Sequence, residues 1–229
     1  KINSIEFNDY AYSNIITKGT FQKKYFSGEV KIDDPNLDFT SDIEIDLNKA
    51  QPSYNIVGDL VQSNLKALNL YPEAIKITGL LDANFTGTNI DNFLGSAKFL
   101  NANIKGERTE ISFDSLKLSS TYIDSVKSLS LTNNDFNASI VGKFSIMELP
   151  ASIQSFLNHY YPAYIKPPKT VPKNQVFEVT ANTIYFEPYL KLLNKNLSGF
   201  NDASVQGSID TRKNNLGITA NLPYGKYQN

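Results

Sequence analysis

The feature that most restricts the fold of this chain is a strict alternation of apolar and polar residues within short segments. Residues 42–47 (DIEIDL) show the pattern most clearly. Successive side chains of a β-strand point to opposite faces, so a period of two predicts strands with one buried and one solvated face. Asp42, Glu44 and Asp46 would then point outward together. A metal-binding cluster is the alternative for these acids, but a solvated strand face is sufficient to explain them.

Similar segments recur at a spacing of roughly ten residues, which is typical of an all-β fold. They lie at 26–30, 75–85, 97–104, 111–118, 129–131, 136–144, 177–179, 205–209 and 218–222. No long helical segments alternate with them, so a parallel α/β sheet is not expected. Loose repeats of the strand pattern indicate a quasi-linear array in which each unit contacts mainly its neighbours.

One segment breaks the alternation. Ile111 and Phe113 are out of phase with Leu116 and Leu118. A bulge or bend near residues 114–115 would restore a common face.

Polar turn residues separate other segments. Residues 133–135 (NND) lie between two strand patterns and predict a turn. Residues 214–215 (NN) predict a hairpin that returns the chain onto the last pattern.

Two segments have helical rather than strand periodicity. Residues 145–161 carry apolar side chains at intervals of three and four, with Pro150 in the first turn and Pro162 after the end. Residues 188–197 form a shorter stripe of leucines before Gly199. Residues 162–172 contain four prolines and predict an extended loop, which could be a boundary between two sheet modules.

Composition excludes several classes of function. The chain of 229 residues has 22 basic and 23 acidic residues, no cysteine and one histidine. No basic field is present to bind nucleic acid, and no polybasic segment is present to bind an anionic membrane. Without cysteine there is no disulfide scaffold and no thiolate metal site. No apolar window is long enough for a transmembrane helix, so we expect membrane contact only through segments outside this chain.

Candidate catalytic residues are few. His159 cannot form a site that needs two histidines, and its position near the end of a predicted helix favours a surface role. Asp33 and Asp34 precede a proline and fit a turn better than a carboxylate dyad. No glycine-rich phosphate motif is present. We therefore expect neither an enzyme nor a cofactor. Because the chain begins within a strand pattern and lacks a signal peptide, we expect it to be a piece of a longer protein.

The order of these motifs resembles the AsmA-like superfamily, and TamB-like proteins in particular. Residues 79–95 (GLLDANFTGTNIDNFLG) are similar to its glycine–strand–glycine repeat with a following aspartate and glycine. Residues 26–37 (FSGEVKIDDPNL) look like the stretch that precedes this repeat in TamB-like proteins of Bacteroidota. Residues 111–144 continue the likeness, and residues 149–162 fit a helical interruption of that group.

The resemblance implies an elongated, curved antiparallel sheet that forms a U-shaped groove, extending over residues 1–229 with one or two short helices. TamB-like proteins are anchored in the inner membrane and cross the periplasm. They are linked to phospholipid transport toward the outer membrane and to outer-membrane protein assembly with a TamA-type or BamA-like barrel. The family has no catalytic residues to carry over.

An apolar groove of this kind would hold acyl chains, if the apolar face stays uncovered by the chain itself. The candidate groove residues come from the alternating segments. They are Phe85, Phe99, Ile104, Ile111, Phe113, Leu116, Leu118, Leu129, Leu131, Phe136, Ile140 and Phe144.

Two alternatives to a lipid conduit remain open. An assembly factor would pair an exposed, uncharged strand edge with a partner barrel or client strand. A structural β-sandwich or adhesin-like module would instead cover its apolar face with a second sheet.

Overall fold

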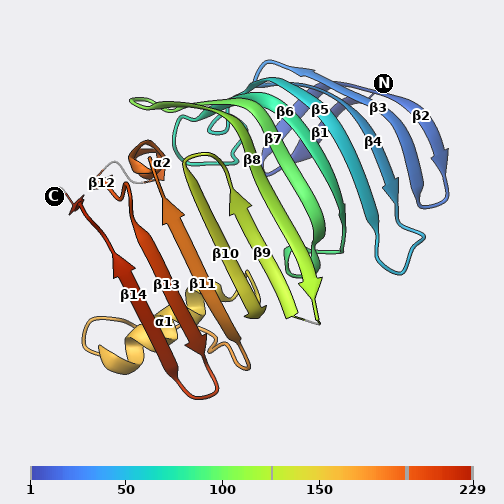
Figure 1. The fold of residues 1–229 in the computed structure, drawn as a ribbon. Helices are drawn as coiled ribbons and strands as arrows, with labels where there is room; N and C mark the ends of the chain where they lie inside the picture. Colours follow the sequence, from blue (N-terminus) through green and yellow to red (C-terminus); the bar gives the residue numbers. More distant parts are fainter. Residues whose placement is uncertain (1, 125, 194–195, 228–229) are drawn as a thin grey trace.

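The computed structural model describes residues 2–124, 126–193 and 196–227 of the chain, without the side chains of Ile90 and Leu193. Thirteen strands form one antiparallel sheet in the order β1 to β11, then β13 and β14 (Figure 1). From β2 to β10, every strand lies between its two neighbours in sequence. The predicted fold class, a mainly-β protein built on an elongated, curved antiparallel sheet with two short helices, is therefore confirmed.

The strands of the main sheet are long in the N-terminal half and shorter in the C-terminal half. They are β1 Ile2–Phe7, β2 Tyr10–Gln22, β3 Tyr25–Asp34, β4 Leu37–Asp46, β5 Ser53–Ser63, β6 Lys76–Thr86, β7 Leu94–Lys105, β8 Glu110–Ile123, β9 Val126–Thr132, β10 Phe136–Lys143, β11 Val176–Thr183, β13 Ser204–Asp210 and β14 Asn215–Asn221. A separate two-stranded ladder joins β12 (Leu197–Gly199) to β15 (Gly225–Tyr227).

Both predicted helices are present, with shorter bounds than expected. Helix α1 spans Leu149–Tyr160, with a proline at its start, and Pro162 follows it. Helix α2 spans Glu187–Leu193, whereas the sequence predicted a helix to residue 197. Leu197 and Gly199 instead belong to β12, so the predicted end of this helix is wrong. A single 3-10 turn, η1 (Ile90–Asn92), precedes β7.

The insertion between β10 and β11 leaves the sheet unbroken. It contains α1 and the proline-rich residues 162–172, which form the expected loop. On either side, β10 and β11 pair along their full length, from Phe136–Thr183 to Lys143–Val176. The sheet is thus continuous at the place where the sequence analysis allowed a boundary between two modules.

The predicted bulge or bend near residues 114–115 is an unpaired position in the β7–β8 ladder, whose register does not shift, so no residue is inserted in β8. The β7–β8 ladder passes from Leu100–Ser115 to Ala102–Phe113 without pairing Asn101 and Asp114. Asn101 has a left-handed φ of 48°. Leu116 consequently packs in one cluster with Ile111 and Phe113.

The predicted turns are also present. The Asn133 side-chain oxygen accepts hydrogen bonds from the backbone N–H groups of Asp135 (2.9 Å) and Phe136 (2.8 Å). This pattern closes the β9–β10 turn. Asn214 has a φ of 50° and closes the β13–β14 hairpin.

The sheet is strongly curved at its N-terminal end. Asn69, in the loop between β5 and β6, donates through its side-chain amide to the carbonyl oxygens of Asn8 (3.1 Å) and Asp9 (3.2 Å) in the β1–β2 turn. This contact joins two turns with β3 and β4 between their strands. It accompanies the bend visible in Figure 1, where β1 is turned beneath the arched strands.

Glycines opposite phenylalanines mark two points of close strand contact. Gly95 faces Phe85, and Gly142 faces Phe177. Their φ angles are 131° and 139°, a region that residues with a Cβ rarely adopt. A Cβ added to Gly142 would lie 2.6 Å from the Cα of Phe177. The Cα and Cβ of Phe177 therefore occupy the space that a side chain at position 142 would need.

We expect Gly142→Ala to lower the free energy of unfolding by about 2 kcal/mol, through backbone strain and the collision with Phe177. Gly207→Ala is a matched control in β13, because its added Cβ would meet no atom closer than 3.5 Å. Urea unfolding monitored by circular dichroism measures both. Equal losses in the two variants would show that the geometry at Gly142 is not special.

Candidate functional site

The main sheet has one wholly apolar row of side chains that crosses ten strands. Residues paired directly across an antiparallel ladder point to the same face. The row runs from β4 to β14 through the paired residues Ile43, Ile56, Ala83, Ala97, Leu118, Leu131, Ala138, Ala181, Val205 and Ala220. We call the face that carries this row the inner face.

The adjacent row, one residue further along each strand, is wholly polar and points to the opposite, outer face. It consists of Glu44, Asn55, Asn84, Ser96, Ser119, Ser130, Ser139, Thr180, Gln206 and Thr219. Ser139 and Thr180 share a hydrogen bond of 2.7 Å across two of these strands. Asp42 and Glu44 are exposed on this face, as expected of a solvated strand face.

All twelve candidate groove residues lie on the inner face, because the ladder register and the two apolar clusters place them together. They differ in exposure. Ile111, Phe113 and Phe144 are buried, at 6%, 7% and 9% exposure. The other nine, from Phe85 to Ile140, are partly exposed. Partial exposure of large apolar side chains indicates a single layer, whereas a second covering sheet would bury them.

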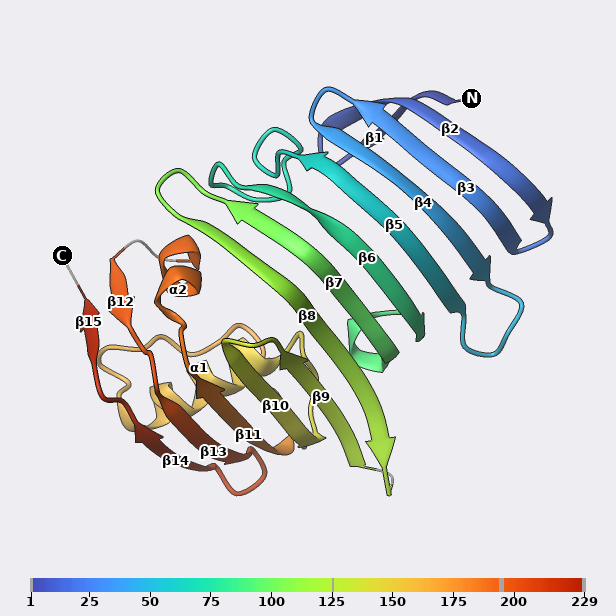
Figure 2. The ribbon, with the colours of Figure 1, turned by 45° about the horizontal axis from the view of Figure 1, so that its top comes forward.

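Both helices lie on the inner face, over the C-terminal half of the sheet. Ile146 and Leu149, at the start of α1, pack on Phe144, Phe177 and Ile209. Figure 2 shows α1 lying behind β10, β11 and β13. The expectation that the chain leaves its apolar face uncovered is therefore wrong for this section. The packing clusters that include helix residues contain no residue of β3–β6, whose inner side chains are mostly partly exposed.

Helix α2 covers the opposite end of the strands. Tyr189 and Leu192 pack on the cluster of Ala102, Ile111 and Phe113. The ring of Phe136 makes edge-on contacts with Tyr189 at 5.2 Å between centroids. The two helices thus lie at different ends of β10, α1 after its last residue and α2 beside its first.

An apolar cavity of about 460 Å³ lies between α2 and the sheet. Its exposed lining is entirely apolar and includes Leu131, Ala138, Ala181, Phe186 and Leu192. No charged side chain lines it. A cavity without hydrogen-bonding groups favours a hydrocarbon over water or a polar ligand.

A short hydrogen-bond chain fastens α2 to the sheet. The hydroxyl of Tyr189 donates to the carboxylate of Asp135 at 2.6 Å and accepts from the side-chain amide of Asn133 at 2.8 Å. Burial, together with the hydrogen bond to Asp135, raises the pKa of Tyr189 well above its ordinary value. We call this arrangement the Tyr189 latch.

Polar residues also lie on the inner face, among them Ser120, Lys127 and Asp34, and the sequence analysis assigned no role to the first two. Ser120 is 1% exposed, and its hydroxyl has no hydrogen-bond partner within the described residues. Lys127 is 5% exposed, with its ammonium 5.1 Å from the centre of the Phe144 ring and hydrogen-bonded to the carbonyl oxygen of Asp91. Burial lowers the pKa of Lys127, an effect that nearby Asp91 partly offsets.

The third is Asp34, which closes the inner face near the β1–β2 turn. Its carboxylate accepts hydrogen bonds from the Tyr10 hydroxyl (2.5 Å), from Ser13 and from the backbone N–H of Asn36. Burial alone would raise the pKa of Asp34, but these hydrogen bonds outweigh burial and lower it. The residue is thus a structural acceptor at a turn, in line with the turn role predicted for it.

Comparison with known proteins gives no relative. No protein-family model, no curated protein and no solved structure matches this chain. Within the described residues, no helix has the length and apolar character needed to cross a membrane.

Removing the latch hydroxyl tests its contribution. We expect Tyr189→Phe to lower the free energy of unfolding by about 1–2 kcal/mol, because Asp135 and Asn133 lose a buried partner. The raised pKa also gives a pH dependence. The stabilisation is complete below pH 10.0, the ordinary value for tyrosine, and is lost as the pH rises further, because only the unfolded chain then ionises readily.

Urea unfolding at neutral pH and again above pH 10 measures both effects. Tyr10 and Tyr12 also have raised pKa values, so Tyr189→Phe should reduce the alkaline loss without abolishing it. Tyr164→Phe is the control, since Tyr164 is 87% exposed. An unchanged alkaline slope in Tyr189→Phe would show that the latch does not stabilise the fold.

Proposed function

We propose that this chain is a segment of a cell-envelope lipid conduit, whose inner face carries phospholipid acyl chains. The observation that carries the proposal is the pair of adjacent rows described above, one wholly apolar and one wholly polar, across ten strands of a single-layer sheet. A soluble domain normally covers such a face with a second layer. Here the inner side chains of β3–β6 are mostly partly exposed.

The energetics suit transport better than tight binding. An acyl chain on the inner face gains about 0.8 kcal/mol for each methylene removed from water. Apolar contacts have no preferred direction, so adjacent positions along the apolar row differ little in free energy. A lipid tail would therefore slide easily along the row, whereas escape into water would be unfavourable. The polar headgroup would remain in water at the open side.

The helices divide the groove into two sections. Over β3–β6 the inner side chains are mostly partly exposed and lie outside the helix-containing clusters, so in this proposal a tail enters and leaves there. Near α2 the tail would end in the 460 Å³ apolar cavity, where no polar group competes for it. In this proposal α1 and α2 are fixed covers that narrow the groove.

The sequence motifs support a location and a partner for this activity. The resemblance to TamB-like proteins favours a periplasmic segment of an inner-membrane-anchored protein that acts in outer-membrane biogenesis with a BamA-like barrel. Catalysis is not part of the proposal. His159 is exposed, and Asp33 and Asp34 belong to strand β3 beside a turn.

Photo-crosslinking tests the groove directly. The purified chain is incubated with vesicles that contain phosphatidylethanolamine with a diazirine in one acyl chain, then irradiated and digested for mass spectrometry. We expect adducts on inner-face residues. Ile43→Asn combined with Leu118→Asn should lower the adduct yield about tenfold, because an amide facing a hydrocarbon lacks a hydrogen-bond partner.

Val57→Asn combined with Val141→Asn is the matched control. These valines lie on the outer face, at 54% and 41% exposure, and their replacement should leave the yield unchanged. Circular dichroism confirms that both double variants are folded. Adducts spread over the outer face, or an equal loss in both variants, would contradict the proposal.

A second candidate function is strand pairing with another protein, as expected of an assembly factor. Among the described strands, β14 pairs only with β13, so one of its edges is free. Its sequence, NLGITAN, carries no charge, and Ile218 is 64% exposed. Natural edge strands usually carry charges that prevent pairing, so an uncharged edge favours the addition of a strand.

Ile218→Lys tests this alternative, since a charge on the edge strand opposes pairing. The readout is the ability of the chain to keep an unfolded outer-membrane β-barrel protein soluble. We expect the variant to lose that ability, while Ile5→Lys in the other edge strand, β1, retains it. If the parent chain provides no protection, or if both variants behave alike, the β14 edge is not a docking site.

A further inference from the structure

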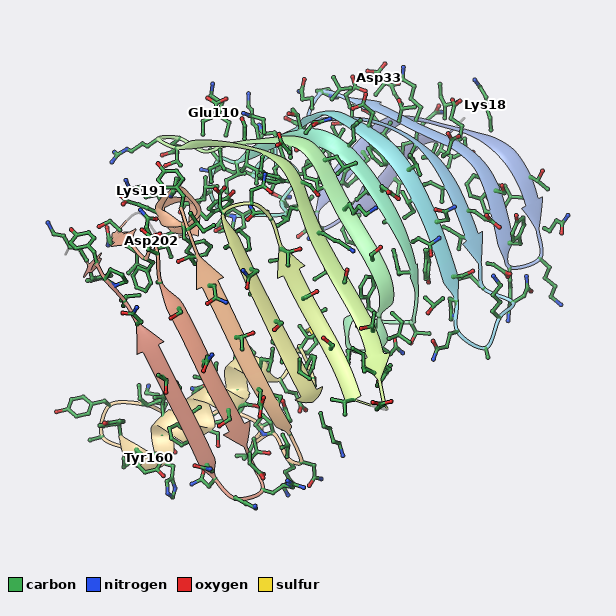
Figure 3. The ribbon with its side chains drawn as sticks, viewed as in Figure 1. Lys18, Asp33, Glu110, Tyr160, Lys191 and Asp202 are labelled. Carbon is green, nitrogen blue, oxygen red and sulfur yellow. The ribbon has the colours of Figure 1, made fainter. Side chains whose placement is uncertain are left out.

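Helix α1 and the turn after it carry a cluster of exposed apolar and aromatic side chains. Ile153 is 46% exposed, Tyr160 56%, Tyr161 59% and Tyr164 87%. Ile153 and Tyr160 are seven residues apart, so they lie on one side of the helix. Leu149, four residues before Ile153, lies on the same side and packs on the sheet, so this side of α1 passes from packed at its start to exposed at its end. Figure 3 shows Tyr160 on α1 at the periphery of the molecule.

Hydrogen bonds hold the turn after α1 in place. The Asn158 side-chain amide donates to the carbonyl oxygen of Ile165 at 2.6 Å, and Gln154 donates to that of Lys166 at 2.9 Å. The backbone N–H groups of Tyr164 and Ile165 both donate to the carbonyl of Tyr161, each at 3.0 Å. The turn is therefore folded back along the helix, and its side chains are positioned before any partner binds.

Three lysines follow this cluster in the sequence. Lys166, Lys169 and Lys173 are all exposed. The only acidic residue between positions 145 and 175 is Glu148. Its carboxylate accepts a hydrogen bond of 2.9 Å from Gln175. The insertion is thus locally basic in a chain whose net charge is −1.

We propose that this surface, formed by Ile153, Tyr160, Tyr161, Tyr164, Lys166 and Lys169, docks on the face of an anionic phospholipid bilayer. Tyrosine places an apolar ring at the acyl boundary and its hydroxyl among the headgroups. Lysine reaches the lipid phosphates from a flexible stem. Three lysines are fewer than a polybasic segment contains, so the tyrosines provide most of the binding and the charges select anionic lipid.

This docking revises the expectation that membrane contact needs segments outside the chain. It does not depend on the proposed lipid groove, because none of its six residues is a candidate groove residue or lines the apolar cavity. The two are complementary, since docking of α1 would bring the covered end of the groove to a membrane.

Vesicle flotation of the 229-residue chain tests the surface. The probes are vesicles of phosphatidylcholine alone and vesicles of phosphatidylcholine with phosphatidylglycerol. We expect binding to the second and much less to the first. The triple variant Tyr160→Ser, Tyr161→Ser, Tyr164→Ser should bind about tenfold less, through loss of the inserted rings. Lys166→Gln combined with Lys169→Gln should remove the preference for phosphatidylglycerol.

Matched controls distinguish binding through this surface from nonspecific adsorption of the chain to vesicles. Tyr122→Ser combined with Tyr185→Ser removes two rings that are each 56% exposed, and Lys31→Gln combined with Lys117→Gln removes two exposed charges. Both should bind as the parent chain does. No flotation of the parent chain, or equal losses in the control variants, would overturn the proposal. Flotation and acyl cross-linking report separately on the two proposals. If only the docking proposal fails, acyl chains still cross-link within the groove, and the α1 substitutions leave that yield unchanged.

Discussion

The whole architecture depends on register, because each strand must place its apolar side chains on the same face as those of its neighbours. A slip of one residue in any ladder would replace a residue of the apolar row by one of the polar row. The pairing from Ile43 to Ala220 keeps this phase through ten strands. Where the sequence itself changes phase, in β8, the irregularity at Asn101 and Asp114 restores it. A face that is kept apolar over such a distance, without a covering sheet, is the physical basis of the proposed conduit.

Polar contacts at the strand ends determine where the inner face is covered. The Tyr189 latch fixes α2 beside the start of β10. At the other end, the carboxylate of Asp91 accepts from the Ser145 hydroxyl at 2.8 Å, and its backbone carbonyl receives Lys127. These contacts lie next to the first residues of the α1 insertion. The helices are therefore held by specific hydrogen bonds at the rims, and by apolar contact only further in.

Much of this fold could be predicted from alternation and turn residues. The strands around Ile43, Ala83 and Leu118 followed from period two, and the turns at residues 133–135 and 214–215 followed from asparagines that accept left-handed or capping roles. The proline-bounded start and end of α1 were also predictable. Strands β2 and β5 were not identified, because threonine, glycine and charged residues interrupt their apolar side chains.

The candidate site was predicted less completely. The twelve groove residues do share one face, because parity within a strand is a local property. The positions of helices α1 and α2 over these residues could not be predicted, since nothing in the apolar stripe of a helix indicates which face of a sheet the helix will pack on. The buried Lys127 and the partnerless hydroxyl of Ser120 also depend on contacts between distant segments. A lysine between two strand patterns otherwise looks like an ordinary surface residue.

The serial order of the strands has a mechanical consequence. From β1 to β10 each strand pairs only with the strands before and after it in sequence, so the pairing stays within successive hairpins. Such a chain can assemble hairpin by hairpin, as repeat proteins do, with little loop-closure entropy to overcome. The 32 residues between Lys143 and Val176 form a long insertion in this order. After the insertion the chain continues as β11, which pairs with β10, the strand before the insertion. A pulling force applied to the ends should therefore release the protein in several separate steps, with the insertion joining two segments that unravel at different loads.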